Sequence, residues 1–290
     1  MTKKSFSIIG GDLRSIKLAN LLIEDDNKVK IFGFENAGFD LGIAESDSLF
    51  DAINQTDIVI GPIPFSNDNE NLNAPFSKNP IPIYDVFSNI KDNQLLIAGV
   101  ISKKIAQISK EYNVCSIDLL NREEMAILNA IPTAEGAIKI AIEETPTTLH
   151  NSNVLVLGFG RIGKTLARML KGIGANVYVE ARKYSDLAWI QSSGYIPVPL
   201  DDLANYLPRM NIIFNTIPHV ILNYDLLYRI DRDCLIIDLA SKPGGVDFEK
   251  ARELGLNTIW ALSLPGKIAP VTAAKFIKDT IYNIIEELGG

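Results

Sequence analysis

The chain has 290 residues, of which 47% are hydrophobic and 22% are charged, enough for one large or two medium globular domains with full cores. A net charge of −7 and the lack of a basic stripe with interleaved aromatic residues argue against nucleic acid as the main partner. No run of 18 apolar residues occurs and the N-terminal apolar run is short, so we expect no membrane span and no export signal.

A first α/β unit opens the chain. A strand at residues 5–9 leads into the turn Gly10-Gly11-Asp12 and then an amphipathic helix, and further strands are expected at 29–34, 58–60, 81–86, 95–101 and 114–117. The turn lacks the third glycine of a dinucleotide fingerprint. With Arg14 close by, it predicts a carboxylate-binding or structural role. Residues 65–82, rich in Asn, Asp, Ser and Pro, predict a surface loop, with a lid over the cleft as the alternative.

A linking segment follows this unit. Residues 132–144 predict a helix with Pro132 in its first turn, and residues 147–152 form a polar boundary. We therefore divide the chain into an N-terminal α/β domain (1–130), a linking helix and hinge (131–150), a second α/β domain (151–265) and a C-terminal helix that crosses back to the first domain (266–290).

The segment NVLVLGFGRIGKTLARMLKGIGANVYVEARK, at residues 153–183, has the pattern of strand, glycine turn, helix and second strand of a dinucleotide-binding unit. Gly158 permits the tight turn, Gly160 lets the backbone approach a pyrophosphate, and Gly163 lets the helix pack closely on the strand. The start of the helix offers free N–H groups to the anion. The turn residues predicted to bind the cofactor are Gly158, Phe159, Gly160, Arg161, Ile162 and Gly163.

The end of the second strand indicates which nicotinamide cofactor binds. The tip position, where an acid would bind the ribose diol of NAD, falls at Ala181 and is followed by Arg182 and Lys183, with Ser185 close by. A guanidinium suits a 2′-phosphate, so we predict NADP rather than NAD. Glu180 would select NAD if the register were shifted by one residue, but strand alternation favours Ala181 at the tip. The alternative for Arg182 and Lys183 is a solvated loop.

The pattern continues with helices at 186–193 and 201–206 and strands at 196–198, 212–215 and 235–239, and the chain closes with a helix through Ile277 and Leu288. The loops that follow the strands at 212–215 and 235–239 are expected to line the cleft, because ligands bind at the carboxyl ends of such strands. A third loop that lines the cleft is expected at 264–270. The loop residues predicted to touch the cofactor are Asn215, Thr216, Ile217, Pro218, Leu239, Ala240 and Ser241.

This order of elements predicts an α/β protein with two Rossmann-like doubly wound domains and a cleft between them, similar to formate/glycerate or alanine dehydrogenases. Residues 1–130 are the expected N-terminal Rossmann-like substrate domain, and residues 151–265 are the expected NADP-binding Rossmann domain. Over nearly its whole length the chain resembles the A-subunit family of dipicolinate synthase. The resemblance rests on the segments IIGGDLR (8–14), IPTAEG (131–136), LGFGRIGKTLAR (157–168), ARKYS (181–185), NTIP (215–218), DLASKPGG (238–245) and LPGKIAP (264–270).

The resemblance implies oxidation of a dihydrodipicolinate-level intermediate by NADP to pyridine-2,6-dicarboxylate, in the cytoplasm of the mother cell of a sporulating bacterium. It also implies a second, flavoprotein-like B-subunit of dipicolinate synthase, and we expect a homo-oligomer. The candidates for binding the substrate are Arg14, Thr133, Lys242 and Lys267, and those for catalysis are Glu135 as proton acceptor and Lys242. Each cation is equally an ordinary surface charge, and Glu135 equally a helix-start acid.

Two alternatives concern function. One is a 2-hydroxyacid or amino acid dehydrogenase. Hydroxyacid chemistry needs an imidazole near the substrate hydroxyl, but the two histidines are His150 and His219 and none lies in 262–270. A non-catalytic NADP-binding protein that docks a partner is the other alternative. The sequence contains no cluster typical of a metal site. Cys115 and Cys234 lie in or beside apolar runs and are expected to be buried, reduced thiols.

Overall fold

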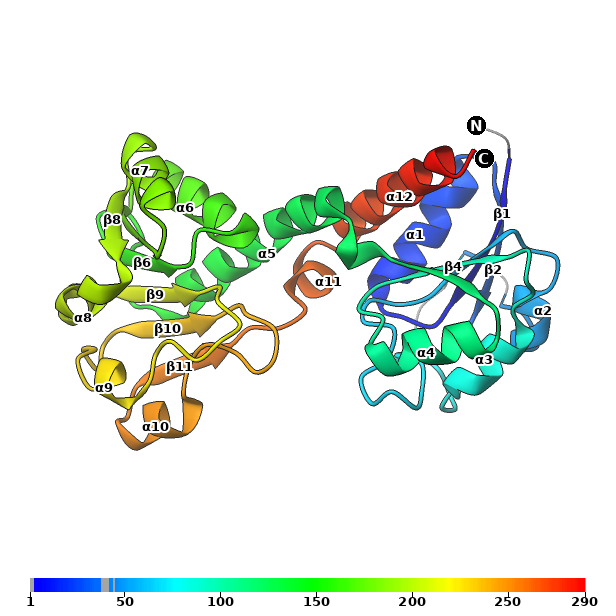
Figure 1. Cartoon of the computed structure of the whole chain (residues 1–290), viewed down its shortest axis with the longest axis horizontal. Coiled ribbons are helices and arrows are strands. Elements are labelled where there is room, and N and C mark those ends of the chain that lie inside the picture. Colours follow the sequence, from blue (N-terminus) through cyan, green and yellow to red (C-terminus); the bar gives the residue numbers. More distant parts are fainter. Residues whose placement is uncertain (1–2, 38–41, 44, 290) are drawn as a thin grey trace. The chain divides into compact units, whose positions relative to one another are not determined.

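The computed structural model describes residues 3–37, 42–43 and 45–289. The chain forms two compact units, one made of residues 1–128 with 269–290 and the other of residues 129–268 (Figure 1). Each unit has one sheet whose paired strands all run parallel. The predicted class of two Rossmann-like α/β domains is therefore confirmed.

The first unit has the strand order β2-β1-β3-β4-β5, the order of a doubly wound sheet whose switch point lies between β1 and β3. Its strands are β1 (Ser5–Ile9), β2 (Lys28–Phe32), β3 (Ile58–Ile60), β4 (Leu95–Ala98) and β5 (Cys115–Asp118). Its helices are α1 (Leu13–Glu24), α2 (Leu49–Ile53), α3 (Ile83–Asn89), α4 (Lys103–Glu111), η1 (Leu119–Asn121), the first part of α5 (Glu123–Glu144), and α12 (Pro270–Glu287).

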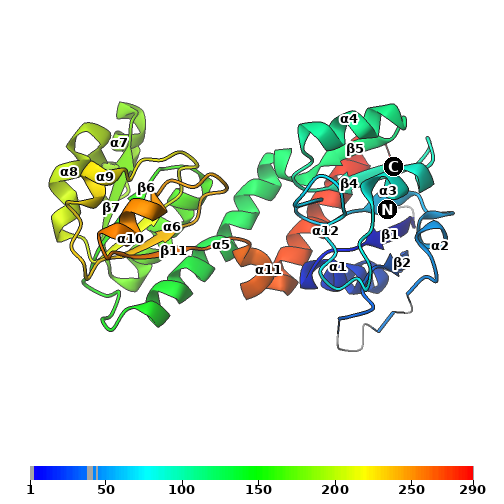
Figure 2. The ribbon, with the colours of Figure 1, turned by 90° about the horizontal axis from the view of Figure 1, so that it is seen from below.

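Helices cover both faces of the sheet in this unit (Figures 1 and 2). An apolar layer on each face holds the helices to the sheet. On one face, alternate strand residues such as Phe6 and Ile8 pack against α1 and α12. On the other face, residues such as Val59 and Leu96 pack against α3 and α4. The two-residue alternation of the strands therefore supplies both cores. Helix α12 lies beside α1, where the Lys278 Nζ atom is 2.6 Å from an Asp25 carboxylate oxygen.

The second unit has the strand order β11-β10-β9-β6-β7-β8. From β6 the chain adds strands on one side of the sheet up to β8 and then on the other side from β9, so the switch point lies between β6 and β9. Its strands are β6 (Asn153–Leu157), β7 (Asn176–Ala181), β8 (Ile196–Pro199), β9 (Ile212–Asn215), β10 (Leu235–Asp238) and β11 (Asn257–Trp260). Its helices are the rest of α5, α6 (Arg161–Ile173), α7 (Tyr184–Ser192), η2 (Leu200–Asp202), α8 (Leu203–Tyr206), η3 (Leu207–Arg209), α9 (Tyr224–Leu227), α10 (Phe248–Glu253) and α11 (Leu264–Ile268).

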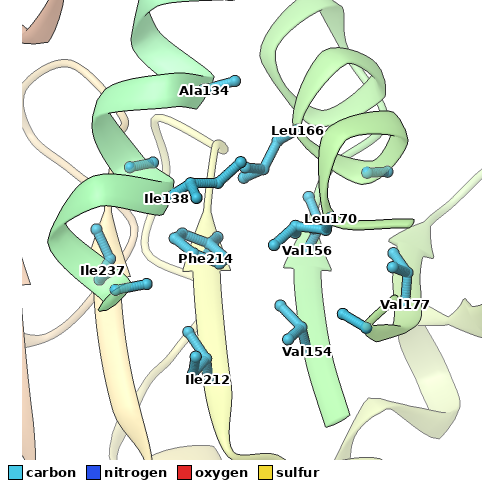
Figure 3. Close-up of a cluster of buried hydrophobic side chains, with 14 of the residues drawn as sticks. Ala134, Ile138, Val154, Val156, Leu166, Leu170, Val177, Ile212, Phe214 and Ile237 are labelled. Carbon is cyan, nitrogen blue, oxygen red and sulfur yellow. The ribbon is translucent and has the colours of Figure 1, made fainter. Parts of the chain in front are cut away.

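One core of the second unit joins α5 and α6 to the sheet. Figure 3 shows Ile138 of α5 beside Phe214 of β9 and Leu170 of α6 beside Val156 of β6, while Leu166 of α6 reaches toward Ile138. Ala134 of α5 belongs to the same cluster. The other face of the sheet is covered by the short helices α8, α9 and α10 through residues such as Leu203, Leu227 and Ala251. Each face of β6 is therefore buried, as the uninterrupted apolar run at 154–157 predicts.

Helix α5 corrects one prediction. It begins at Glu123, nine residues before Pro132, so Pro132 lies inside the helix and not in its first turn. Two glutamates favour the earlier start, because they complement the positive end of the helix dipole. By length and composition alone α5 could cross a membrane, but half of its apolar window is buried, with Ala134, Ala137 and Ala141 in the core. It packs as a core helix does.

Three further predictions were wrong. Residues 81–86 are not a strand, because α3 begins at Ile83, and its buried side chains Ile83, Val86 and Phe87 follow helical spacing. Residues 264–270 form helix α11 and the start of α12 rather than a loop, since Leu264 and Pro265 are buried. Cys115 is exposed on β5 at the edge of the first sheet, whereas Cys234 is buried as expected.

Candidate cofactor and substrate sites

The glycine turn after β6 has the geometry that the fingerprint predicts. Gly158 has a φ of +92°, a left-handed conformation that favours glycine. A Cβ at residue 163 would overlap the Gly158 carbonyl oxygen, so glycine is needed there for the helix to approach the strand. At Gly160 nothing lies within 4 Å of where a Cβ would be. The turn is therefore closed behind Gly163 and open in front of Gly160, which fits a pyrophosphate.

Helix α6 begins directly after this turn. Its N-cap is Gly160, which has no side chain to bind the free N–H groups of the first turn. These groups and the helix dipole favour an anion at that end. The Lys164 ammonium lies 5.2 Å from the centroid of the Phe159 ring, so the first turn of the helix also carries a cation. The residues of the turn therefore fit a dinucleotide phosphate.

At the tip of β7, Ala181 is buried and ends the strand. Arg182, Lys183 and Ser185 follow it and are exposed. Helix α7 begins at Tyr184 without a side-chain cap, so its first N–H groups lie beside these side chains. The predicted tip position, Ala181, therefore carries no carboxylate, and two cations and a hydroxyl follow it within four residues.

Glu180, the residue that would select NAD if the register were shifted, is buried against the glycine turn. Its side chain is only 1% exposed, and its Oε2 atom accepts a hydrogen bond from the Gly158 N–H at 3.1 Å. The Oε1 atom is buried, and within the described part of the chain it has no hydrogen-bond partner. Burial raises the pKa of this carboxyl, opposed by the Gly158 N–H and by the charge of Arg182. Glu180 therefore supports the glycine turn from within the domain.

This raised pKa has a consequence for stability. Between the ordinary pKa of a glutamate and the higher folded value, the folded state holds a proton that the unfolded chain has lost, so stability falls as pH rises through that window. We expect Glu180→Gln to remove the part of the pH dependence of the unfolding free energy that comes from this carboxyl. Urea unfolding at a series of pH values from about 4 to 7.5 measures it. Glu144→Gln, at an exposed position in the same unit, is the control, and equal slopes for wild type and Glu180→Gln would contradict the burial of a titrating carboxyl.

The loops after β9 and β10 lie on the other side of β6. Asn215 is fully buried, its Oδ1 atom accepts from the Ile217 N–H and its Nδ2 atom donates to the Ile217 carbonyl. The Thr216 hydroxyl donates to the Leu157 carbonyl at 2.8 Å, which ties this loop to the end of β6. Leu239 and Ala240 are buried, whereas Pro218, Ser241 and Lys242 are exposed. The predicted cofactor residues thus surround the carboxyl edge of β6, β7, β9 and β10.

In the first unit, Arg14 lies at the start of α1 and is only 7% exposed. Its Nε and Nη2 atoms donate to the Asp12 carboxylate, and Nη2 also donates to the Ile63 carbonyl. A small pocket here is lined by residues that follow β1 and β3 on both sides of the switch point, together with one residue each from β3, η1 and α12. Its lining residues are Asp12, Arg14, Ser15, Leu18, Ile60, Gly61, Pro62, Ile63, Leu119 and Ile277. Arg14 therefore reaches a pocket, although part of its guanidinium is already bound.

The glycine turn of the first unit is covered by the chain itself. The Gly11 N–H donates to the Asn73 carbonyl at 2.9 Å, and a Cβ at Gly10 would come within 2.9 Å of Ala74 and Leu72. The segment 65–82 is irregular as predicted, but its residues Phe65, Leu72 and Ile81 belong to the core. This turn therefore lacks the open space that Gly160 has in the second unit, in keeping with the missing third glycine.

The other predicted substrate residues lie in the second unit. Thr133 is buried on α5, and its hydroxyl donates to the Asn129 carbonyl one turn earlier, a common arrangement for threonine within helices. Glu135 on α5 and Lys267 on α11 are exposed. Helix α11 packs on α5 where Gly136 lies close to Leu264 and Ile268. Within the described residues no group of three or more His, Cys, Asp or Glu side chains could hold a metal ion.

Sequence reasoning missed two residues that shape this site. Glu180 was considered only as a ribose ligand, and its contact with Gly158 was not foreseen. Asp238 was included in a loop without a role, yet it is a fully buried carboxylate at the end of β10. An acidic residue that ends an apolar strand and precedes two glycines was the available signal, because such a buried charge requires several donors.

Comparison with known proteins identifies the two units. Residues 5–120 match the family model of the N-terminal domain of the dipicolinate synthase A-subunit, and residues 132–241 match that of the NAD binding domain of D-isomer specific 2-hydroxyacid dehydrogenases. The dipicolinate synthase A-subunit of Bacillus subtilis (strain 168) is 32% identical to the chain, over 99% of the chain and 98% of its own length.

Solved structures agree with this. The crystal structure of the dipicolinate synthase A-subunit from Bacillus halodurans has a TM-score of 0.88 at 31% identity and covers 97% of both chains. An L-alanine dehydrogenase has a TM-score of 0.65 at 14% identity, over 98% of this chain and 90% of that chain, and shows a shared fold alone. The second unit is thus an NAD(P)-binding domain of the dehydrogenase type.

Proposed function

The chain belongs to the A-subunit family of dipicolinate synthase, and from that membership we propose that it oxidises a dihydrodipicolinate-level intermediate to dipicolinate with NADP. The observation that carries the proposal is the glycine turn, because Gly160 stands open in front of an uncapped α6. That turn would hold the pyrophosphate of NADP, and the bound cofactor would supply a hydride acceptor for a ring carbon of the substrate. Loss of that hydride and of one proton makes the ring aromatic, so the protein mainly positions the ring and excludes water.

The choice of NADP rests on the tip of β7. Arg182, Lys183 and Ser185 would bind the 2′-phosphate through a guanidinium, an ammonium and a hydroxyl. Ala181 offers no carboxylate to the diol of NAD, and Glu180 is buried against Gly158. The glycine turn and the start of α6 would hold the pyrophosphate, and the loops at 215–218 and 239–241 would line the nicotinamide ribose.

The two ring carboxylates of the substrate call for cations. Lys242 and Lys267 in the second unit are exposed and suit this role, and Arg14 in the first unit faces its pocket with Asp12 already bound. Thr133 would contribute its hydroxyl oxygen as an acceptor. Glu135 is exposed on α5 and would take the ring proton. Lys242 would also keep the dicarboxylate oriented during hydride loss.

The family further supports a partner and a setting. An A-subunit implies a B-subunit of dipicolinate synthase, which we propose is flavoprotein-like. We also propose a homo-oligomer and a cytoplasmic location in the mother cell of a sporulating bacterium, where the pathway intermediate would be available.

The experiment is the near-ultraviolet detection of dipicolinate formed from freshly generated pathway intermediate and NADP. The purified chain is tested with and without its partner protein. We expect product from the chain alone, with one NADPH formed per dipicolinate. Product only in the presence of the partner would make this chain the NADP-binding half of a two-subunit enzyme. Absence of product in both mixtures would contradict the proposed reaction.

A further inference from the structure

Asp238 ends β10 at the carboxyl edge of the second sheet and is fully buried. Its Oδ1 atom accepts hydrogen bonds from the Asn215 Nδ2 atom at 2.7 Å and from the Ala240 N–H at 2.9 Å. Its Oδ2 atom accepts one from the Gly245 N–H at 2.7 Å. One carboxylate thus gathers three donors from two loops, which is how a buried acidic group is stabilised without a cation.

These bonds close the loop that carries Lys242. Ala240 and Gly245 stand at its two ends, and each donates its backbone N–H to a different oxygen of Asp238. The exposed residues between them project from a loop whose ends are fixed. A further bond from the Trp260 indole N–H to the Ala240 carbonyl, at 2.9 Å, ties the same loop to β11.

The same carboxylate sets the loop after β9. The Asn215 amide that donates to Asp238 also donates to the Ile217 carbonyl, and its oxygen accepts from the Ile217 N–H. If Asp238 did not hold this amide, Asn215 could rotate and the backbone at Ile217 would lose both of its bonds. The loops at 215–218 and 239–245 are therefore held to each other by hydrogen bonds that all depend on Asp238.

The paired glycines are explained by this arrangement. Gly244 has a φ of +84°, and a Cβ there would lie 2.9 Å from the Asp238 Oδ2 atom. A Cβ at Gly245 would overlap the Asn215 amide. Only residues without a side chain let the loop fold this closely around the carboxylate.

These loops lie where the nicotinamide half of a dinucleotide belongs. The glycine turn follows β6 and the 2′-phosphate candidates follow β7, so a dinucleotide across the switch point extends in the other direction, over β9 and β10. We propose that Asp238 is a positioning residue that holds the nicotinamide-side loops and Lys242 in place, while the adenosine side is set independently by β6 and β7. This inference rests on the proposed function.

Asp238→Asn tests it with little change in shape. Both oxygens of Asp238 accept hydrogen bonds, whereas an asparagine has one acceptor oxygen and one NH₂ group. In the variant the NH₂ group must therefore face another donor, which is either the Gly245 N–H or the pair formed by the Asn215 amide and the Ala240 N–H. At least one buried donor then loses its partner. Two probes are compared by titration calorimetry: NADPH, and adenosine 2′,5′-bisphosphate, which carries the adenosine side alone.

We expect Asp238→Asn to weaken NADPH binding about tenfold and to change binding of the bisphosphate less than about twofold. Trp260→Phe keeps the ring that stacks on Phe248 and removes only the bond to Ala240, so a smaller loss confined to NADPH is expected. Asp57→Asn is the matched control, because it alters a carboxylate in the other unit that accepts from Ser5, and it should change neither affinity.

Equal losses for both probes would reduce Asp238 to a structural residue and overturn the inference, as would unchanged NADPH affinity. If Asp238→Asn does not fold, Trp260→Phe decides by the same comparison. Failure of the wild-type chain to bind either probe would instead overturn the proposed cofactor site, so the two failures are distinguishable.

Discussion

Gly160→Val should strongly weaken dinucleotide binding and leave the protein stable, whereas Gly163→Val should destabilise the protein. The reason is the environment of each Cβ. At residue 160 the side chain would enter open space in front of the turn, and the backbone is extended there with a φ of −82°, which valine adopts easily. At residue 163 it would overlap the Gly158 carbonyl oxygen between helix and strand.

The two substitutions therefore differ in their expected effects on the free energy of unfolding and on NADPH affinity. Gly160→Val should change the free energy of unfolding by less than about 0.5 kcal/mol and lower NADPH affinity on the order of 100-fold, because the pyrophosphate loses about two charge-assisted bonds to backbone N–H groups. Gly163→Val should cost at least about 2 kcal/mol through overpacking. Urea unfolding and NADPH titration of both variants measure these effects. A Gly160→Val protein that still binds NADPH normally would place the phosphate elsewhere.

The fold was predictable where the signal was local. The apolar run at 154–157, the alternation of residues 5–9 and the three spaced glycines each depend on neighbours in sequence, and they predicted β6, β1 and the α6 turn. Short elements were harder. Residues 81–86 are apolar enough for a strand, and only packing on the sheet decides that Ile83, Val86 and Phe87 form a helix face. Residues 264–268 have Pro and Gly, typical of a loop, yet Leu264 and Pro265 are buried beside α5.

The candidate site likewise has one part with a local sequence signal and one part that depends on how distant strands pair. The turn residues and the basic tip of β7 lie within one stretch of about 30 residues with fixed spacing, as the dinucleotide fingerprint requires. The network around Asp238 joins Asn215, Gly245 and Trp260 from three different strands and loops. No spacing rule connects these positions, because the contacts exist only after β9, β10 and β11 pair. Glu180 is similar, since its burial depends on the register of β7 against β6.

The proposed 2′-phosphate site at the tip of β7 predicts which substitutions weaken the binding of NADPH and which favour NADH. Arg182→Ala should lower NADPH affinity by about 1.5–3 kcal/mol, which is roughly 10- to 100-fold, because a guanidinium–phosphate interaction is lost. NADH has no 2′-phosphate and should lose less than about twofold. Arg168→Ala, at an exposed position on α6, is the control and should affect neither cofactor. Equal losses of both cofactors in Arg182→Ala would contradict the 2′-phosphate assignment.

The double variant Ala181→Asp with Arg182→Ala is expected to gain affinity for NADH, not only to lose affinity for NADPH. Residue 181 ends β7, and if it is the ribose-facing position that we propose, a carboxylate there would bind the ribose diol and repel a 2′-phosphate. NADH affinity should rise about tenfold over the single variant while NADPH affinity falls further. If Glu180 were the ribose ligand, this change would add a second carboxylate beside it and NADH affinity would fall instead. The sign of the NADH change therefore decides which of the two adjacent positions faces the ribose.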